Sequence, residues 1–447
     1  MTRPRIQRTL RPRPGQGNII TLVAGLVATI ALVAGVAVAA ARPAQQPTKS
    51  APVTIRLLAC CAEVISAPLI KAFEAANPGI QVTQEVVPFP QLNDVVLQRI
   101  GSKDPSIDVY WADQPRTAAL AARGLLLDLT NTWGRAALGT IFRPSIAAST
   151  WKGKVWSAPW ATSTQLLYYN KALLAKAHIT PPAADPAKRW TREQLLQAAS
   201  AAKRAGAKCG FMFDQVDLYY QLQPLPVSAG GGTGLKGPNN LTPDITNPGW
   251  VKAMNYYAKL FSSGVAPRGI DPAQTPSLFS NGQCAFWEGG PWHVGEFLAA
   301  KNLDWGIAPI PAFAGGKPVT PTDSLGLGVN PYSQHKAETI KFIEFATLTP
   351  TGDLNAVGGS GNVPANIRAA AHYYTTLTRG HPNLKRLGTL ISYEIAKTSV
   401  HRPASVGYID FETIMNRAFS DIRNGKNVVS TLNRAQRELK DAFSRYS

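Results

Sequence analysis

Residues 53–87 read VTIRLLACCAEVISAPLIKAFEAANPGIQVTQEVV, and the stretch changes from a strand pattern to a helix pattern and back. Val53–Leu58 is a short apolar run with β-branched residues, which predicts a strand. Val64–Ala76 has apolar residues at four-residue spacing, which predicts a helix that Asn77–Gly79 ends. Ile80–Val87 predicts a second strand. This order indicates neighbouring parallel strands in an α/β sheet.

The same alternation continues downstream and restarts after residue 160. Further strands are predicted at Ile107–Trp111, Leu166–Tyr169, Gly210–Phe213 and Ala285–Trp287. Helices are predicted at Gln91–Ile100, Pro115–Arg123, Thr191–Ala205, Pro248–Ser263 and Val428–Phe443. We therefore expect two α/β lobes, each a mainly parallel sheet flanked by helices, with a ligand cleft between them outside the carboxyl ends of the strands.

The first 41 residues determine the expected compartment. Five arginines between Arg3 and Arg13 precede Ile19–Ala41, which contains no charged residue. This pattern fits a signal peptide, but about 20 apolar residues also suffice to span a bilayer. A cleaved signal peptide and an N-terminal membrane anchor both remain open, and either places the rest of the chain outside the cytoplasm. Residues 42–52 are rich in Pro, Gln and Ser and predict a linker.

The charge balance raises the question of a nucleic-acid partner. The chain carries a formal net charge of +19, which is compatible with binding to nucleic acid or to an anionic surface. However, the basic residues after residue 41 are dispersed and form no long block. We interpret them as a generally basic surface and expect no nucleic-acid partner.

The four cysteines indicate neither a metal site nor a cofactor site. Cys60 and Cys61 are adjacent, whereas Cys209 and Cys284 each lie on a predicted strand. An exported chain can keep disulfides, so the latter two are either bridged or two buried thiols. Neither pair has the spacing of a zinc site, and we expect no cofactor.

Five segments resemble the sugar-binding, maltose-binding-protein-like members of the bacterial solute-binding proteins, and they occur in family order. The segments are Val53–Val82, with its FEAANPGIQV ending, Gly153–Lys171 (GKVWSAPWATSTQLLYYNK), Phe279–Trp292 (FSNGQCAFWEGGPW), Trp305–Pro311 with Gly326–Asn330, and Gly361–Asn366 (GNVPAN). The second is the most specific.

The resemblance implies a two-lobe periplasmic-binding-protein fold of type II. The first lobe would contain residues 53–161 and 310–361, and the second would contain residues 162–309 and 362–447. It also implies a non-enzymatic, monomeric substrate-binding subunit that closes on a carbohydrate by hinge motion and then meets an ABC permease in the membrane.

A sugar presents apolar C–H faces and a rim of hydroxyl groups, so its site needs a flat aromatic ring and hydrogen-bonding groups around it. Trp292 follows two glycines and a proline, and the resemblance makes it the stacking residue; the alternative is a core tryptophan. Glu288 ends a predicted strand and is either a ligand contact or a solvated turn residue. Asp113 follows the third strand and either contacts ligand or caps the next helix.

The full set of expected ligand contacts is Glu63, Asp113, Trp160, Thr162, Ser163, Trp287, Glu288, Gly290, Trp292, Asp323, Ser324, Ser360 and Asn362. Four of these are carboxylates in a basic protein, which favours a ligand amine with a cation–π contact to Trp292. The loop 59–63 lacks the aromatic residues common in relatives, which argues against a long malto-oligosaccharide. We therefore expect an amino sugar or a small oligosaccharide.

The sequence also leaves alternatives to carbohydrate binding. Paired carboxylates would suit a glycosidase, but no catalytic motif accompanies them. Tyrosine pairs such as Tyr168–Tyr169 resemble ferric sites, although adjacent strand residues point to opposite faces. Glycerophosphodiester, polyamine and peptide ligands stay open, as does a purely structural role in the cell envelope.

Overall fold

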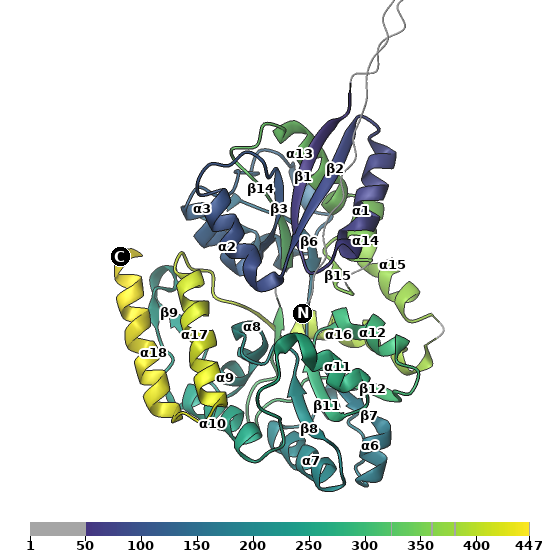
Figure 1. Cartoon of the computed structure of the whole chain (residues 1–447), viewed down its shortest axis with the longest axis vertical. Coiled ribbons are helices and arrows are strands. Elements are labelled where there is room, and N and C mark those ends of the chain that lie inside the picture. The colour runs from purple at the N-terminus through teal and green to yellow at the C-terminus, as the bar shows by residue number, and fades with distance from the viewer. Residues whose placement is uncertain (1–50, 323, 359–360, 380, 447) are drawn as a thin grey trace, which may run out of the picture. The chain divides into compact units, whose positions relative to one another are not determined.

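The computed structural model describes residues 51–447 except 323, 359–360, 380 and 447, so the expected signal or anchor at 19–41 lies outside the described residues. Figure 1 shows the described chain as two lobes, each built around one sheet. A separate hydrophobic core fills each lobe. None of the helices in the described part combines the length and apolar character needed to cross a bilayer.

The first lobe contains a six-stranded sheet. Its order is β15 (Val363–Pro364), β6 (Ala158–Thr162), β14 (Ser324–Val329), β3 (Val109–Asp113), β1 (Val53–Cys60) and β2 (Ile80–Val87). β1 is parallel to β2 and β3, as its flanking helices predict. β15 joins this sheet although it follows the expected limit of the first lobe at residue 361.

Helices cover the first sheet because each buries one apolar stripe. α1 (Glu63–Ala76) buries Leu69 and Phe73, and the Phe73 ring meets the Phe342 ring of α13 (Lys336–Leu348) at 5.0 Å. α1 ends before Pro78, which cannot continue a helix. α2 (Phe89–Arg99) and α14 (Pro350–Val357) also belong to this lobe.

The second lobe contains a four-stranded sheet. Its order is β12 (Trp305–Ala308), β7 (Leu166–Asn170), β11 (Cys284–Gly289) and β8 (Cys209–Phe213). A disulfide joins Cys209 to Cys284 across the neighbouring strands β8 and β11, which is the bridged alternative. A second disulfide joins Cys60 to Cys61.

The expectation of mainly parallel sheets is wrong. β14 is antiparallel to both β3 and β6, β15 is antiparallel to β6, and β7 is antiparallel to β11 and β12. Strand–helix–strand units do give parallel pairs, but β7 and β14 are reached by chain segments that come from the other lobe. A strand that enters a sheet from the other lobe starts at the opposite edge and so runs antiparallel.

Helices of the second lobe follow their sequence signals. α7 (Arg192–Arg204) begins with the predicted capping box, in which Thr191 and Gln194 bond reciprocally. The Trp250 ring of α10 (Pro248–Ser262) stacks on the Phe419 ring of α17 (Tyr408–Arg423) at 6.4 Å. The C-terminal helix is α18 (Val428–Phe443), as predicted.

Shorter elements complete the described chain. The remaining helices are α3 (Thr117–Ala122), α4 (Arg135–Leu138), α5 (Arg143–Ala148), α6 (Lys171–Lys176), α8 (Tyr219–Leu222), α9 (Pro224–Ser228), α11 (Thr275–Ser280), α12 (Val294–Ala299), α15 (Ile367–Leu377) and α16 (Leu387–Lys397). β13 (Thr320–Thr322) pairs in parallel with β16 (Ser399–His401). β13 lies in the segment that leads from β12 of the second sheet to β14 of the first, whereas β16 lies between α16 and α17. Two two-stranded sheets consist of β4 (Thr150–Trp151) with β5 (Lys154–Val155), and β9 (Leu235–Lys236) with β10 (Thr242–Pro243).

Candidate functional site

The carboxyl ends of the parallel strands define two edges where side chains gather. In the first lobe, the parallel strands β1 and β3 end at Cys60 and Asp113. In the second lobe, the parallel strands β8 and β11 end at Phe213 and Gly289. Ligands of α/β folds bind outside such ends. A ligand site is therefore expected at these two edges.

Asp113 at the first edge is paired with arginines from two directions. Arg402 donates two hydrogen bonds to its carboxylate, at 3.0 and 2.6 Å, and Arg116 from the following turn pairs with it as well. Arg116 also pairs with Glu412 of α17, which accepts a 3.1 Å hydrogen bond from Tyr408. Burial alone would raise the pKa of Asp113, but the two guanidinium groups outweigh it and lower that pKa. This cluster joins the first sheet to the second lobe.

Trp292 at the second edge has a fixed orientation. Its indole Nε1 donates a 3.0 Å hydrogen bond to Asp214, which directly follows β8. A Cβ at Gly290 would lie 2.0 Å from the Trp292 ring, and a Cβ at Gly361, where φ is +66°, would lie 2.6 Å from the Trp292 Cα. Only glycine fits at these two positions. The ring is partly buried, so one indole is held in place beside solvent.

Tyr220 connects the two edges. Its ring centroid lies 6.2 Å from that of Trp292 and 4.9 Å from the guanidinium carbon of Arg402. Its hydroxyl is 2.8 Å from that of Ser163, in the segment between β6 and β7. Contacts therefore run from Asp113 through Arg402 and Tyr220 to Trp292. We define this set, together with Ser163 and Asp214, as the edge cluster.

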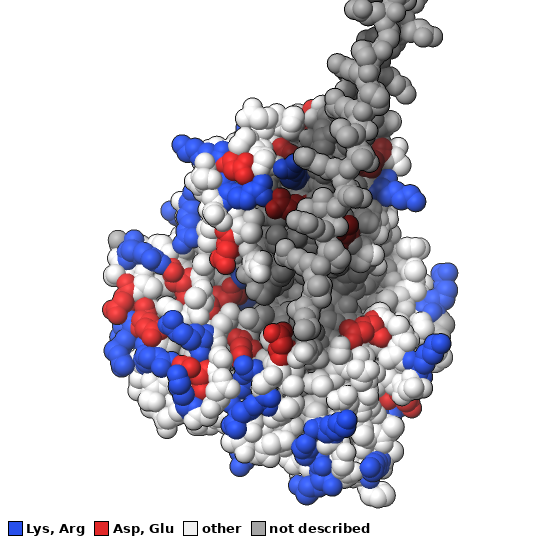
Figure 2. Space-filling model, viewed as in Figure 1, with Lys and Arg blue, Asp and Glu red and all other residues white. Residues whose placement is uncertain are grey.

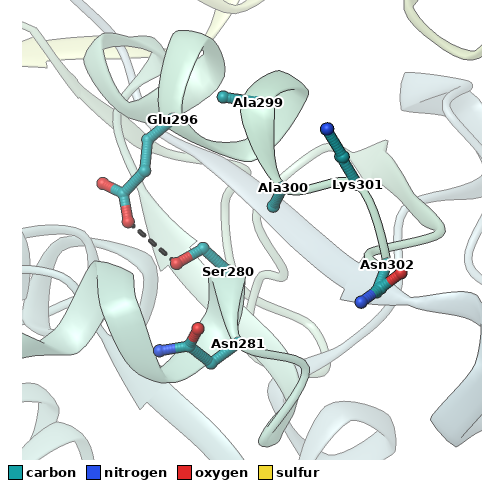
Figure 3. Close-up of a pocket in the computed structure, with 7 residues that line it drawn as sticks. All are labelled: Ser280, Asn281, Glu296, Ala299, Ala300, Lys301 and Asn302. Carbon is teal, nitrogen blue, oxygen red and sulfur yellow. Dashed lines mark hydrogen bonds between the residues drawn. The ribbon is translucent and has the colours of Figure 1, made fainter.

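A pocket of the second lobe is lined by Glu296, which is in contact with His293. His293 contacts Asp214 and Glu296, both at 3.3 Å, and Glu296 accepts a 2.9 Å hydrogen bond from Ser280. Burial alone would lower the pKa of His293, but the hydrogen bonds to the two carboxylates raise it to about 9. The pocket encloses about 410 Å³, and Figure 3 shows Glu296 and Ser280 pointing toward one another beside it. The other lining residues are Asn281, Ala299, Ala300, Lys301 and Asn302.

Two expected contacts point away from the edge, into the interior of the second lobe. Trp287 is fully buried, and its ring packs at 5.2 Å from Tyr168 and 5.1 Å from Phe297. Glu288 is also fully buried, and Arg192 donates to it at 2.5 and 3.1 Å. Successive strand residues face opposite sides of a sheet, so neither side chain projects from the strand end. Glu288 is thus neither exposed to ligand nor a solvated turn residue.

Other expected residues divide between the core and the junction of the lobes. Trp160 packs in the first core with its ring 4.9 Å from that of Trp111. Thr162 is buried 3.4 Å from Thr322. Glu63 is exposed at the start of α1, and Asn362 is buried just before β15. Asp323 and Ser360 lie outside the described residues, and of Ser324 only the backbone, paired with Thr162, is described.

Three members of the edge cluster were missed at the sequence level. Asp214 directly follows a predicted strand, so the reasoning applied to Asp113 would have found it. Tyr220 lies on the short helix α8, and Arg402 follows β16 far from both sheets in sequence. No local pattern marks Tyr220 or Arg402, because their positions depend on how distant segments pack.

The described residues contain no cluster of metal ligands, and the face in Figure 2 shows no basic band. No group of three or more His, Cys, Asp or Glu residues among the described residues could hold a metal ion. Tyr168, from one expected ferric pair, is buried and donates to the carbonyl oxygen of Gly290. On the face in Figure 2, basic and acidic side chains are interspersed rather than gathered into a basic band.

Comparisons with known proteins agree with this architecture. Residues 62–352 match the model of the family described as bacterial extracellular solute-binding protein. A maltodextrin-binding protein of Bacillus subtilis is 28% identical over 310 residues, which cover 66% of this chain and 69% of the relative. A galactooligosaccharide-binding protein of the same organism is 28% identical over 276 residues, which cover 59% and 60%.

Two solved structures with the same fold are described as complexes with a sugar. An ABC substrate-binding protein from Listeria monocytogenes in complex with cycloalternan has a TM-score of 0.78 at 20% identity, covering 88% of this chain and 99% of that one. Maltose-bound MalE3 of T. maritima has a TM-score of 0.75 at 21% identity, covering 87% and 99%. This similarity confirms the expected two-lobe periplasmic-binding-protein fold of type II.

Proposed function

Because the chain belongs to the family of bacterial extracellular solute-binding proteins, we propose that it is the substrate-binding subunit of an ABC importer and that its substrate is a carbohydrate. It acts outside the cytoplasm as a monomer and delivers its ligand to a membrane permease. The family and the similar structures are those of binding proteins, so we assign no catalytic step.

The fixed orientation of Trp292 carries the carbohydrate proposal. A flat aromatic ring suits the apolar C–H face of a sugar, and its Nε1 is already bonded to Asp214, so the ring keeps its position when the ligand arrives. Hydroxyl, carboxylate and guanidinium groups of the edge cluster surround it and suit the polar rim of a sugar. The sugar-binding relatives support the same class.

Within this class, the structure favours a small, neutral oligosaccharide over an amino sugar. The amine hypothesis rested on four carboxylates. Asp113 and Glu288 are now paired with buried arginines, Glu63 is exposed on α1, and Asp323 is outside the described residues. An amine would have to displace a guanidinium group from a bidentate pair, which costs more than the pairing of free charges.

Ligand-dependent unfolding tests the proposal. The protein is heated with maltose, galactose-based oligosaccharides, a glucosamine disaccharide, glycerophosphodiesters, polyamines or ferric ion. A ligand at 100 times its dissociation constant adds about 2.7 kcal/mol to the unfolding free energy. We expect a neutral oligosaccharide to raise the midpoint most.

The other outcomes separate the alternatives. A larger shift with the glucosamine disaccharide would restore the amino-sugar hypothesis. A shift with a glycerophosphodiester alone would move the substrate to the phosphate esters of glycerol, and one relative, of Rhizobium meliloti, is named as an sn-glycerol-3-phosphate-binding protein. A shift with polyamine or ferric ion alone would contradict the carbohydrate assignment.

A further inference from the structure

We propose that the disulfide between the adjacent Cys60 and Cys61 forms part of the ligand site of the first lobe, and that its reduction weakens carbohydrate binding. The inference rests on the proposed function, because it concerns the same site. It adds a contact surface and a redox dependence.

The disulfide lies at the edge that faces the second lobe. Cys60 is the last residue of β1, and β1 is parallel and adjacent to β3, which ends at Asp113. Asp113 in turn bonds to Arg402 of the edge cluster. Parallel neighbours end at the same edge of a sheet, so the two sulfurs belong to the edge where ligands of this architecture bind.

Exposure differs sharply between the two cysteines. Cys60 is 3% exposed, whereas Cys61 is exposed at the surface of this edge. The loop between β1 and α1 contains no aromatic residue that could cover this surface. Sulfur is apolar and polarizable, so a pair of bonded sulfurs offers a small surface for the C–H face of a sugar.

The Cys60–Cys61 disulfide closes a ring around an unusual backbone turn at Cys61. Cys61 has φ +79°, in the region that side chains other than glycine rarely adopt, and the Ala62 amide donates to the Cys60 carbonyl at 3.1 Å in a three-residue turn. α1 begins directly afterwards, and its N-cap residue Ala62 has no side chain that caps it. A ring closed between adjacent side chains holds this turn, and reduction releases it.

The chemistry requires a dithiol reductant. One thiolate of the dithiol attacks a sulfur of the Cys60–Cys61 bond, and its second thiol then resolves the mixed disulfide. The dithiol ends as a disulfide, and the protein ends with two thiols. The second disulfide of the chain provides a matched comparison, because Cys209 and Cys284 are 2% and 0% exposed and an attacking thiolate cannot reach them in the folded protein.

The experiment reduces the native full-length protein with dithiothreitol under mild conditions and measures two quantities on the same sample. Alkylation followed by peptide mass spectrometry counts free thiols at each cysteine. Titration calorimetry gives the affinity for the oligosaccharide that stabilises the oxidised protein most. We expect labels at Cys60 and Cys61 but not at Cys209 or Cys284, an affinity loss of about tenfold, and recovery after reoxidation.

Cysteine variants distinguish the loss of the Cys60–Cys61 disulfide from an unspecific effect of dithiothreitol on the protein. Cys60→Ser/Cys61→Ser should show the reduced affinity and no response to dithiothreitol, whereas Cys209→Ala/Cys284→Ala should keep the response. Unchanged affinity in a sample labelled at Cys60 and Cys61 would overturn the inference and leave the carbohydrate function intact. If the oxidised protein binds no carbohydrate at all, the proposed function fails and the inference fails with it.

Discussion

At the scale of single residues, Trp292 shows how a ligand-facing side chain is made rigid. Its ring is constrained by one hydrogen bond, to Asp214, and by two glycines that leave no room for a Cβ. A ring that is already ordered loses little rotamer freedom on binding, so more of the contact energy appears as affinity. By contrast, Trp287 packs inside the second core five positions earlier in the same motif.

Replacement of Trp292 should weaken binding without unfolding the protein. We expect Trp292→Ala to lower the carbohydrate affinity about tenfold, the equivalent of roughly 1.4 kcal/mol, because the aromatic face is lost. Trp292→Phe should retain part of the affinity. Trp151→Ala is the control, since Trp151 is a partly buried tryptophan outside the edge cluster. Calorimetric titration measures all three, and equal affinity for Trp292→Ala and wild type would refute the stacking role.

His293 should give the protein a measurable loss of stability at alkaline pH. Its pKa in the fold is about 9, above the ordinary value of 6.5. The charged form therefore stabilises the fold fully below pH 6.5, and this contribution disappears as the pH rises through 9. The shift corresponds to about 3 kcal/mol at most.

The measurement for His293 is urea unfolding between pH 6 and 10. His293→Gln serves as the reference, because it keeps a polar side chain but cannot gain the charge. We expect the difference in unfolding free energy between wild type and variant to shrink steadily above pH 7. A difference that stays constant with pH would show that His293 is not charged in the fold.

At the scale of elements, the edge cluster is built mainly from residues at or just after the ends of strands. β3 and β8 each deliver a carboxylate, Asp113 and Asp214, to the edge where their sheet meets the other lobe. The short strand β16 places Arg402 against Asp113. A cluster of buried charges therefore contributes to the contact between the lobes.

Loss of Arg402 should destabilise the junction of the lobes. Arg402→Met leaves one buried arginine, Arg116, to neutralise both Asp113 and Glu412, and an unbalanced buried charge costs about 3 kcal/mol. Arg445→Met is the matched control, because Arg445 is exposed in its pair with Asp410 and the pair should contribute less than about 1 kcal/mol. Chemical denaturation measures both variants.

A double-mutant cycle checks the coupling. The double variant Asp113→Asn/Arg402→Met should lose clearly less unfolding free energy than the two single variants together. Each single change removes one member of the buried pair and leaves the other behind, whereas the double change removes both partners. If the two changes in unfolding free energy add exactly, Asp113 and Arg402 do not stabilise one another.

At the scale of the whole molecule, two sheets with separate cores are joined by crossing segments and by a charged cluster. Separate cores allow each lobe to move as a rigid body, since neither must repack when the angle between them changes. β13, in the segment that leads from the second sheet to the first, pairs with β16 of the second lobe.

Ligand should therefore change the shape of the protein in solution. We expect a saturating neutral oligosaccharide to reduce the radius of gyration measured by small-angle X-ray scattering. Trp292→Ala at the same ligand concentration should show a smaller change, in line with its weaker binding. A ligand that binds tightly in calorimetry yet leaves the scattering curve unchanged would contradict hinge closure.

The sequence by itself determined the local elements and the family. Apolar spacing places α1, β2, α7 and α18 within a residue or two, and Asn77–Gly79 marks the end of α1, because these patterns depend on neighbours in the chain. The end of a predicted strand made Asp113 a candidate, and the two glycines and the proline before it, together with the family resemblance, made Trp292 one.

Only the tertiary structure decided which charges are paired and which strands run antiparallel. Glu288 looked like a ligand contact until Arg192, 96 positions away, proved to lie against it. Arg402 and Asp113 are 289 residues apart, and no local pattern joins them. The physical reason is that hydrogen bonds and ion pairs act over a few ångströms in space, whereas sequence patterns report only contacts within one helix, strand or turn.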